Sequence, residues 1–110
     1  MEKFDLDDMV KGWFVGDFEP NVICTKECEV GIKKYTAGTI ENAHYHKKAV
    51  ELTVVVTGKI RMNNDIFEAG DIVKVERNEI IEFEAINDST TVVFKTGSYK
   101  GDKFLVNQNT

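Results

Sequence analysis

The sequence predicts an all-β protein, a small sandwich or barrel, and three observations lead to this prediction. The chain has 110 residues, which is the size of a single domain with one core. From residue 21 onward, short runs rich in Val, Ile, Thr, Phe and Tyr are interrupted about every eight to twelve residues by Gly, Asn or Asp. No internal repeat or linker divides these runs. Strands joined by tight turns are therefore expected along most of the chain.

Residues 1–20 differ in composition from the rest and are expected to form an N-terminal arm. Acidic residues are interleaved there with the aromatic residues Phe4, Trp13, Phe14 and Phe18. The segment ends at Pro20, the only proline of the chain. Leu6, Met9 and Val10 fall at helical spacing, which predicts a helix around residues 5–11.

Residues 21–110 are expected to form the barrel, and the apolar runs give its strands. The expected strands are near 21–25, 29–36, 42–47, 50–57, 59–62, 65–68, 71–75, 80–86 and 90–96. Asn63 and Asn64 tolerate positive φ, so they predict a tight hairpin between two of these strands. Apolar and charged side chains alternate at 81–85, which places both glutamates of this strand on its outer face.

Both histidines of the chain lie in one predicted strand, separated by one residue. Side chains alternate across a strand, so His44 and His46 share a face, with about 7 Å between their α-carbons. Glu51 begins the next strand, and antiparallel pairing would bring its carboxylate to the same face. Two imidazoles and one carboxylate suit iron(II) and related divalent metals. The alternative is that the histidines are surface residues beside Lys47 and Lys48, and that Glu51 pairs with a lysine.

A longer pattern around these residues decides between the two interpretations. Glycines and ligand-type residues occur at the offsets G(x)5HxH(x)4E(x)6G, formed by Gly38, His44, His46, Glu51 and Gly58. This pattern resembles the first motif of the cupin family. The resemblance implies a double-stranded β-helix, also called a jelly roll, with a divalent metal ion (Fe, Mn, Ni or Zn) bound by both histidines and the glutamate. It also implies a homodimer and a small-molecule ligand.

The second cupin motif, G(x)5PxG(x)2H(x)3N, is only partly present. Gly70 matches its first glycine, while Glu76 replaces the proline and Asn78 replaces the second glycine. Asn78 can still adopt the left-handed conformation that glycine would supply. Ile81 stands in the place of the fourth metal ligand and cannot coordinate, so we expect it inside the barrel and a site with three ligands. Glu82 could replace the missing histidine only if a bulge turned it inward.

The arm and two strand residues are further candidates for contacts with a ligand or a subunit. The strand at 50–57 is largely apolar on both faces. Its outward residues are Leu52, Val54 and Val56, so this outer face needs a cover. The arm could supply this cover, from its own subunit or from a neighbour. Trp13 is expected to pack in a core, with ligand contact as the alternative. Tyr35 and Asn42 are weaker candidates for the pocket. Asn42 is included because alternation along the strand places it on the same face as the two histidines.

Charge, hydropathy and cysteine content exclude several classes of protein. Lys and Arg total 14 against 19 Asp and Glu, and the basic residues are scattered, so no partner among nucleic acids is expected. No apolar run approaches the ~20 residues of a membrane span, and no leader peptide is evident. We therefore expect a cytosolic protein without a membrane partner. Cys24 and Cys28 lack the further ligands of a zinc site and are expected to be reduced thiols.

The function predicted from these observations is a metal-binding, single-domain cupin that acts on or binds a small oxygen-rich molecule. Proteins of this family include dioxygenases, isomerases, epimerases, decarboxylases, lyases and binding proteins. No further acid, base or nucleophile in the sequence selects one reaction, so turnover stays open. The alternatives are a non-catalytic protein that binds a sugar-like or carboxylate ligand, and a dimeric interaction module with a degenerate metal site.

Overall fold

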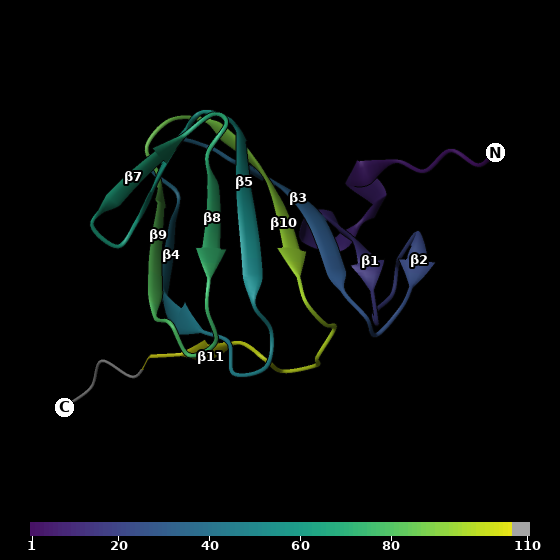
Figure 1. The fold of residues 1–110 in the computed structure, drawn as a ribbon. Coiled ribbons are helices and arrows are strands. Elements are labelled where there is room, and N and C mark those ends of the chain that lie inside the picture. The colour runs from purple at the N-terminus through teal and green to yellow at the C-terminus, as the bar shows by residue number, and fades with distance from the viewer. Residues whose placement is uncertain (107–110) are drawn as a thin grey trace.

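A computed structural model describes residues 1–106 as two β-sheets packed face to face (Figure 1). The large sheet contains, in spatial order, β2 (Ile23–Cys24), β1 (Trp13–Gly16), β3 (Glu29–Tyr35), β10 (Ser89–Lys95), β5 (Glu51–Thr57) and β8 (Ile72–Val75). The small sheet contains β11 (Phe104–Leu105), β4 (Ile40–Tyr45), β9 (Ile81–Ala85), β6 (Lys59–Met62) and β7 (Asp65–Glu68). The neighbouring strands pair antiparallel, except β1 with β2. The all-β prediction is confirmed.

The path of the chain between the sheets defines the architecture. From β3 to β10 the chain passes repeatedly from one sheet to the other, so strands adjacent in sequence mostly face each other across the interior. Without the strands of the arm and the C-terminal segment, the order is β3-β10-β5-β8 in the large sheet and β4-β9-β6-β7 in the small sheet. This order is that of a jelly roll, the double-stranded β-helix expected from the sequence.

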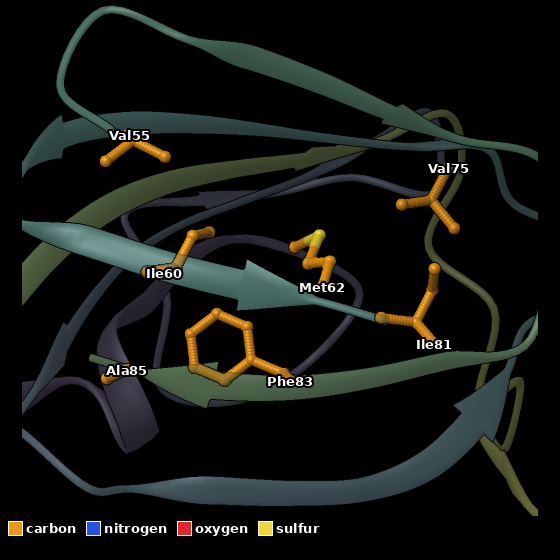
Figure 2. Packing of buried hydrophobic residues seen from close by; sticks show 7 residues of the cluster. All are labelled: Val55, Ile60, Met62, Val75, Ile81, Phe83 and Ala85. Atoms are coloured by element: carbon orange, nitrogen blue, oxygen red, sulfur yellow. The ribbon is translucent and has the colours of Figure 1, made fainter. Parts of the chain in front are cut away.

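The hydrophobic core lies between the two sheets, on strands β5, β6, β8 and β9 (Figure 2). Its buried members are Val55, Ile60, Met62, Val75, Ile81, Phe83 and Ala85. In the small sheet Ile60 lies opposite Ala85, and Met62 lies opposite Phe83, so the side chains of neighbouring strands meet on the inner face. Ile81 and Phe83 are both inside, as the alternation at 81–85 predicted.

Two turns have the conformations that the sequence predicted. Asn63 has φ 54° in the two-residue connection between β6 and β7, which confirms the hairpin. Asn78 has φ 65°, so it adopts the left-handed conformation expected of a residue that replaces glycine.

Gly58 has φ 90°, and a β-carbon there would lie 2.4 Å from the carbonyl oxygen of Asp88. Only glycine fits this position of the first motif without rearrangement.

The predicted helix at 5–11 is wrong. The arm forms two short 3-10 turns instead, η1 (Leu6–Asp8) and η2 (Val10–Gly12). Lys11 has φ 53° and Gly12 has φ 83°, and neither value is compatible with a right-handed helix. The apolar residues whose spacing indicated a helix therefore lie in and between two separate turns.

The second half of the arm is a strand that the sequence analysis missed. β1 has four residues and adds to the large sheet beside β3, with Trp13 opposite Gly31. A β-carbon on Gly31 would lie 2.7 Å from the indole of Trp13, so glycine makes room for the ring on the sheet. The strand escaped prediction because it is short and its register with β3 shifts between Trp13 and Val15.

The arm does not cover the outer face of β5. It lies at the β3 edge of the large sheet, whereas β5 lies beyond β10 (Figure 1). Val56 on β5 and Ile72 on β8 are exposed large apolar residues on this part of the sheet. A cover supplied by a neighbouring subunit stays a prediction. No helix among residues 1–106 is long and apolar enough to cross a membrane.

Replacement of Ile60 by alanine tests the assignment of the core. Ile60 is 0% exposed, whereas Ile66 on the adjacent strand β7 is 51% exposed, so Ile66→Ala is a matched control. We expect Ile60→Ala to lower the free energy of unfolding by about 2–5 kcal/mol, because it removes buried methyl groups and leaves a cavity. Ile66→Ala should change it by less than about 1 kcal/mol. Urea denaturation measures both values, and equal losses would contradict the core assignment.

Candidate functional site

A cavity of about 410 Å³ opens between the two sheets and contains all three predicted metal ligands. Strands β3, β4, β5 and β10 contribute most of its lining, and Trp13 of the arm adds to it. Met62, Ile81 and Phe83 belong both to its wall and to the hydrophobic core. The cavity therefore combines an apolar wall with titratable side chains, and its size is typical of a site for a small molecule.

The two histidines lie together on the cavity wall, as strand alternation predicted. His44 is in β4, and His46 follows one residue after the end of this strand. Both are buried, and their ring centroids are 5.5 Å apart. Tyr45 points to the other side, where its ring stacks on Phe104.

The hydrogen bonding of His44 defines which of its nitrogens is free. Its Nδ1 lies 3.0 Å from the carbonyl oxygen of Asn42. Because a carbonyl oxygen only accepts, Nδ1 carries the hydrogen, and in the neutral imidazole Nε2 then has the lone pair. Metal-binding histidines commonly have this arrangement, in which one nitrogen is held by a second group and the other is free to coordinate.

Burial keeps the imidazole of His46 in its neutral form. Removal from water, together with the nearby charge of Lys95, lowers the pKa of His46 to about 4. At neutral pH this side chain is therefore uncharged, which is the form that binds metals.

Glu51 is the first residue of β5 and lies between β8 and β10, opposite Val75 and Lys95. Burial raises the pKa of the Glu51 carboxyl, while Lys95 and His44 lower it to a smaller extent. A metal ion needs the ionised carboxylate, so a proton on Glu51 would compete with metal binding.

The three candidate ligands share one cavity, but they do not converge on one point. Within residues 1–106, no three side chains of His, Cys, Asp or Glu are grouped so that they could hold a metal ion. The donor atoms of His44, His46 and Glu51 nevertheless fit a divalent cation in chemistry. The site with three ligands stays a prediction.

Position 81, where the cupin motif has its fourth ligand, faces the cavity. Ile81 lies opposite His44 in the pairing of β9 with β4, and it is 8% exposed. Glu82 is exposed on the other side of β9, where its backbone N–H donates to Asn63 Oδ1. Glu82 therefore does not take the place of the missing histidine in this arrangement.

A β-bulge in β4 changes which side chains enter the cavity. Glu41 pairs with Phe83 and His44 pairs with Ile81, so three steps along β4 match two steps along β9. As a result Glu41 lines the cavity and Asn42 is exposed, the reverse of the predicted parity. Tyr35 also lines the cavity and donates its hydroxyl to Glu41 at 3.1 Å. Strict alternation could not reveal Glu41, because the bulge depends on the pairing with β9.

Lysines are the second group of cavity residues that the sequence analysis missed. Lys33 of β3 and Lys95 of β10 line the cavity, and both ammonium groups lie near the ring of Trp13, at 5.2 and 4.9 Å from its centroid. Lys95 could have been found from the sequence, because alternation places it on the same face of a predicted strand as Thr91 and Val93. Trp13 therefore lies beside charged cavity residues as well as on the sheet.

The C-terminal segment holds the loop between two of the candidate ligands. The carboxylate of Asp102 accepts hydrogen bonds from the backbone N–H groups of Lys47, Lys48 and Ala49, at 3.0–3.2 Å. β11 then pairs with β4, with Leu105 opposite His44. This segment, to which the sequence analysis assigned no role, fixes the backbone that joins His46 to Glu51.

Comparisons with known proteins agree with this architecture. No protein-family model and no curated protein matches the chain. Among solved structures, an uncharacterized protein with a double-stranded β-helix domain from Klebsiella pneumoniae is 16% identical, with a TM-score of 0.71 over 94% of this chain and 90% of its own. A cupin-2 domain protein from Shewanella frigidimarina is 15% identical, with a TM-score of 0.55 over 64% of this chain and 71% of its own.

A third structure is a bacterial pirin from Escherichia coli in complex with nickel(II). It is 12% identical, with a TM-score of 0.66 over 80% of this chain and 39% of its own, so it is a much longer protein. Together with the strand order, these similarities show that the chain has the double-stranded β-helix fold of cupin proteins. At this level of identity they define the fold and leave the chemistry to the residues of the site.

Asp102→Asn tests the role of the C-terminal segment. The amide offers one acceptor oxygen in place of two and carries no charge, so we expect a loss of about 1–3 kcal/mol in the free energy of unfolding. The amides of Lys48 and Ala49 should exchange hydrogen faster. Asp65→Asn is the matched control, because Asp65 is exposed and its side chain forms no hydrogen bond or ion pair within residues 1–106. Unchanged exchange in the Asp102 variant would contradict this role.

Proposed function

We propose that this protein binds a divalent metal ion through His44, His46 and Glu51, and that it binds a small oxygen-rich molecule in the adjoining cavity. One observation carries the proposal: the three residues that the cupin motif spaces along the sequence line one cavity between the sheets. The free Nε2 of His44 and the neutral form of His46 support the same assignment.

The residues of the cavity have separate tasks in this proposal. A bound metal ion would act as a Lewis acid toward an oxygen of the small molecule. Ile81, beside His44 on the neighbouring strand β9, gives this wall an apolar surface and no fourth ligand. Tyr35 and Glu41 form a hydrogen-bonded pair at the cavity wall, which can donate to or accept from a polar group of the ligand.

Binding of a small anion without a metal ion and without turnover is a second candidate function, and two observations favour it. Within residues 1–106, the ligand-type side chains are not grouped for a metal ion. The cavity also contains several lysines, which favour an anionic ligand and oppose a divalent cation. Elemental analysis of protein purified without chelator or nickel resin separates the two candidates. The homodimer and the cytosolic location complete the proposal and stay predictions.

The metal site is tested by replacing both histidines. We expect the protein to bind about one divalent ion per chain, and His44→Ala with His46→Ala to abolish this binding, because two of three donors are lost. Glu82→Gln is the control, since Glu82 carries a carboxylate but is exposed on the outer side of β9. Calorimetric titration with Mn²⁺, Ni²⁺ and Zn²⁺ gives the stoichiometry. Equal binding in the double variant would show that the histidines are not ligands.

Restoration of the family's fourth ligand is a second test of the same site. Ile81→His should tighten metal binding about tenfold or more, because position 81 faces the cavity opposite His44. Ile80→His provides the control, since Ile80 is exposed and adjacent in sequence. Circular dichroism checks that the buried substitution leaves the barrel folded. A folded Ile81→His variant with unchanged affinity would contradict a metal site at this place.

A further inference from the structure

The cavity carries an excess of positive charge in a protein whose net charge is negative. Four lysines and two glutamates line it, namely Lys11, Lys33, Lys95, Lys103, Glu41 and Glu51. The whole chain has a net charge of −5. A cleft lined mainly by one sign of charge concentrates ions of the opposite sign. The charges of the cavity therefore favour a negatively charged ligand.

Two of these lysines are held beside the aromatic ring of the arm. Lys33 and Lys95 lie on β3 and β10, and Trp13 lies near both ammonium groups. Gly31, opposite Trp13, leaves the space that the indole occupies. The arm thus brings an aromatic surface to the two cations, and cation–π attraction restrains their positions.

Both ammonium groups keep hydrogen-bond donors for a ligand. Lys33 Nζ donates one bond, to the carbonyl oxygen of Lys11 at 2.7 Å, and an ammonium group has three donors. Lys95 Nζ forms an ion pair with Glu29 Oε1, but the 3.8 Å between the two atoms is longer than a hydrogen bond. The other carboxylate oxygen of Glu29 accepts from the hydroxyl of Ser98. Burial lowers the pKa of Lys33, an effect that a bound anion would offset.

A buried hydroxyl on the strand next to Lys33 has no hydrogen-bond partner within residues 1–106. Thr91 lies opposite Lys33 in the pairing of β10 with β3, lines the cavity and is 1% exposed. Its Oγ1 forms no hydrogen bond with another described residue. Such a group costs free energy when it is left unsatisfied. A ligand oxygen in the cavity can supply the missing partner.

We propose that Lys33, Lys95 and Thr91, together with the ring of Trp13, form a subsite for the carboxylate of a small organic acid. The apolar wall formed by Met62, Ile81 and Phe83 would contact the carbon skeleton of this acid. The inference deepens the proposed function, since the subsite lies in the same cavity, and it defines the ligand as an anion with an apolar part. None of its four residues is a candidate metal ligand, so the subsite can be tested without metal.

Benzoate is a suitable probe, because it joins a carboxylate to a compact apolar ring and has an uncharged isostere, benzamide. Binding is measured on protein freed of metal by dialysis against chelator. Trp13 is the only tryptophan of the chain, so its fluorescence and its indole N–H signal report on the subsite directly. We expect benzoate to bind and to shift both signals, and benzamide to bind at least about tenfold more weakly.

Lysine variants locate the subsite. Lys33→Gln and Lys95→Gln should each weaken benzoate binding about tenfold. Lys34→Gln is the matched control, because Lys34 is the exposed neighbour of Lys33 and its replacement removes the same charge. It should change the affinity less than twofold. If Lys34→Gln weakens binding as much as Lys33→Gln, the effect is one of overall charge and the subsite is disproved.

The remaining outcomes separate this inference from the proposed metal function. Absence of benzoate binding to metal-free protein, with binding restored by Mn²⁺, would overturn the lysine subsite and support the metal site. Binding of benzoate by a protein that binds no metal would support the subsite and overturn the metal function. Sulfate tests for a general anion site: if it binds as tightly as benzoate, the assignment to a carboxylate with an apolar part is wrong.

Discussion

The interior of this protein depends on the alternation of side chains across paired strands. Because consecutive strands lie mostly in opposite sheets, the inward residues of each strand face those of the next across the barrel. The same alternation builds the core at Ile60 and Phe83 and places His44 and His46 on the cavity wall. Any shift of register would exchange interior and exterior, so the backbone pairing controls both stability and the site.

Two segments outside the strands β3 to β10 complete the cavity. The arm adds β1 to the edge of the large sheet and brings Trp13 to Lys33 and Lys95. The C-terminal segment fixes the loop between His46 and Glu51 through Asp102. The jelly roll therefore provides the framework, while the two flanking segments add Lys11, Trp13 and Lys103 to the lining of the cavity.

The charged residues of this cavity favour ligands of opposite sign. A divalent cation requires neutral imidazoles and an ionised Glu51, whereas the lysines favour an anion and also favour the ionised carboxylate. A metal ion and an organic acid can satisfy both demands together, because their charges compensate one another. The neutral state of His46 at physiological pH is compatible with either occupant.

The sequence by itself determined the strands from β2 to β10, the hairpin at Asn63, the inward position of Ile81 and the common face of His44 and His46. These features depend on local periodicity and turn conformation, which a single segment encodes. Only the tertiary structure decided that Glu41 enters the cavity, that Lys33 and Lys95 meet Trp13, and that Asp102 binds the loop before Glu51. Each of these depends on a bulge or on contacts between residues distant in sequence, and such contacts arise only when strands pair and flanking segments dock.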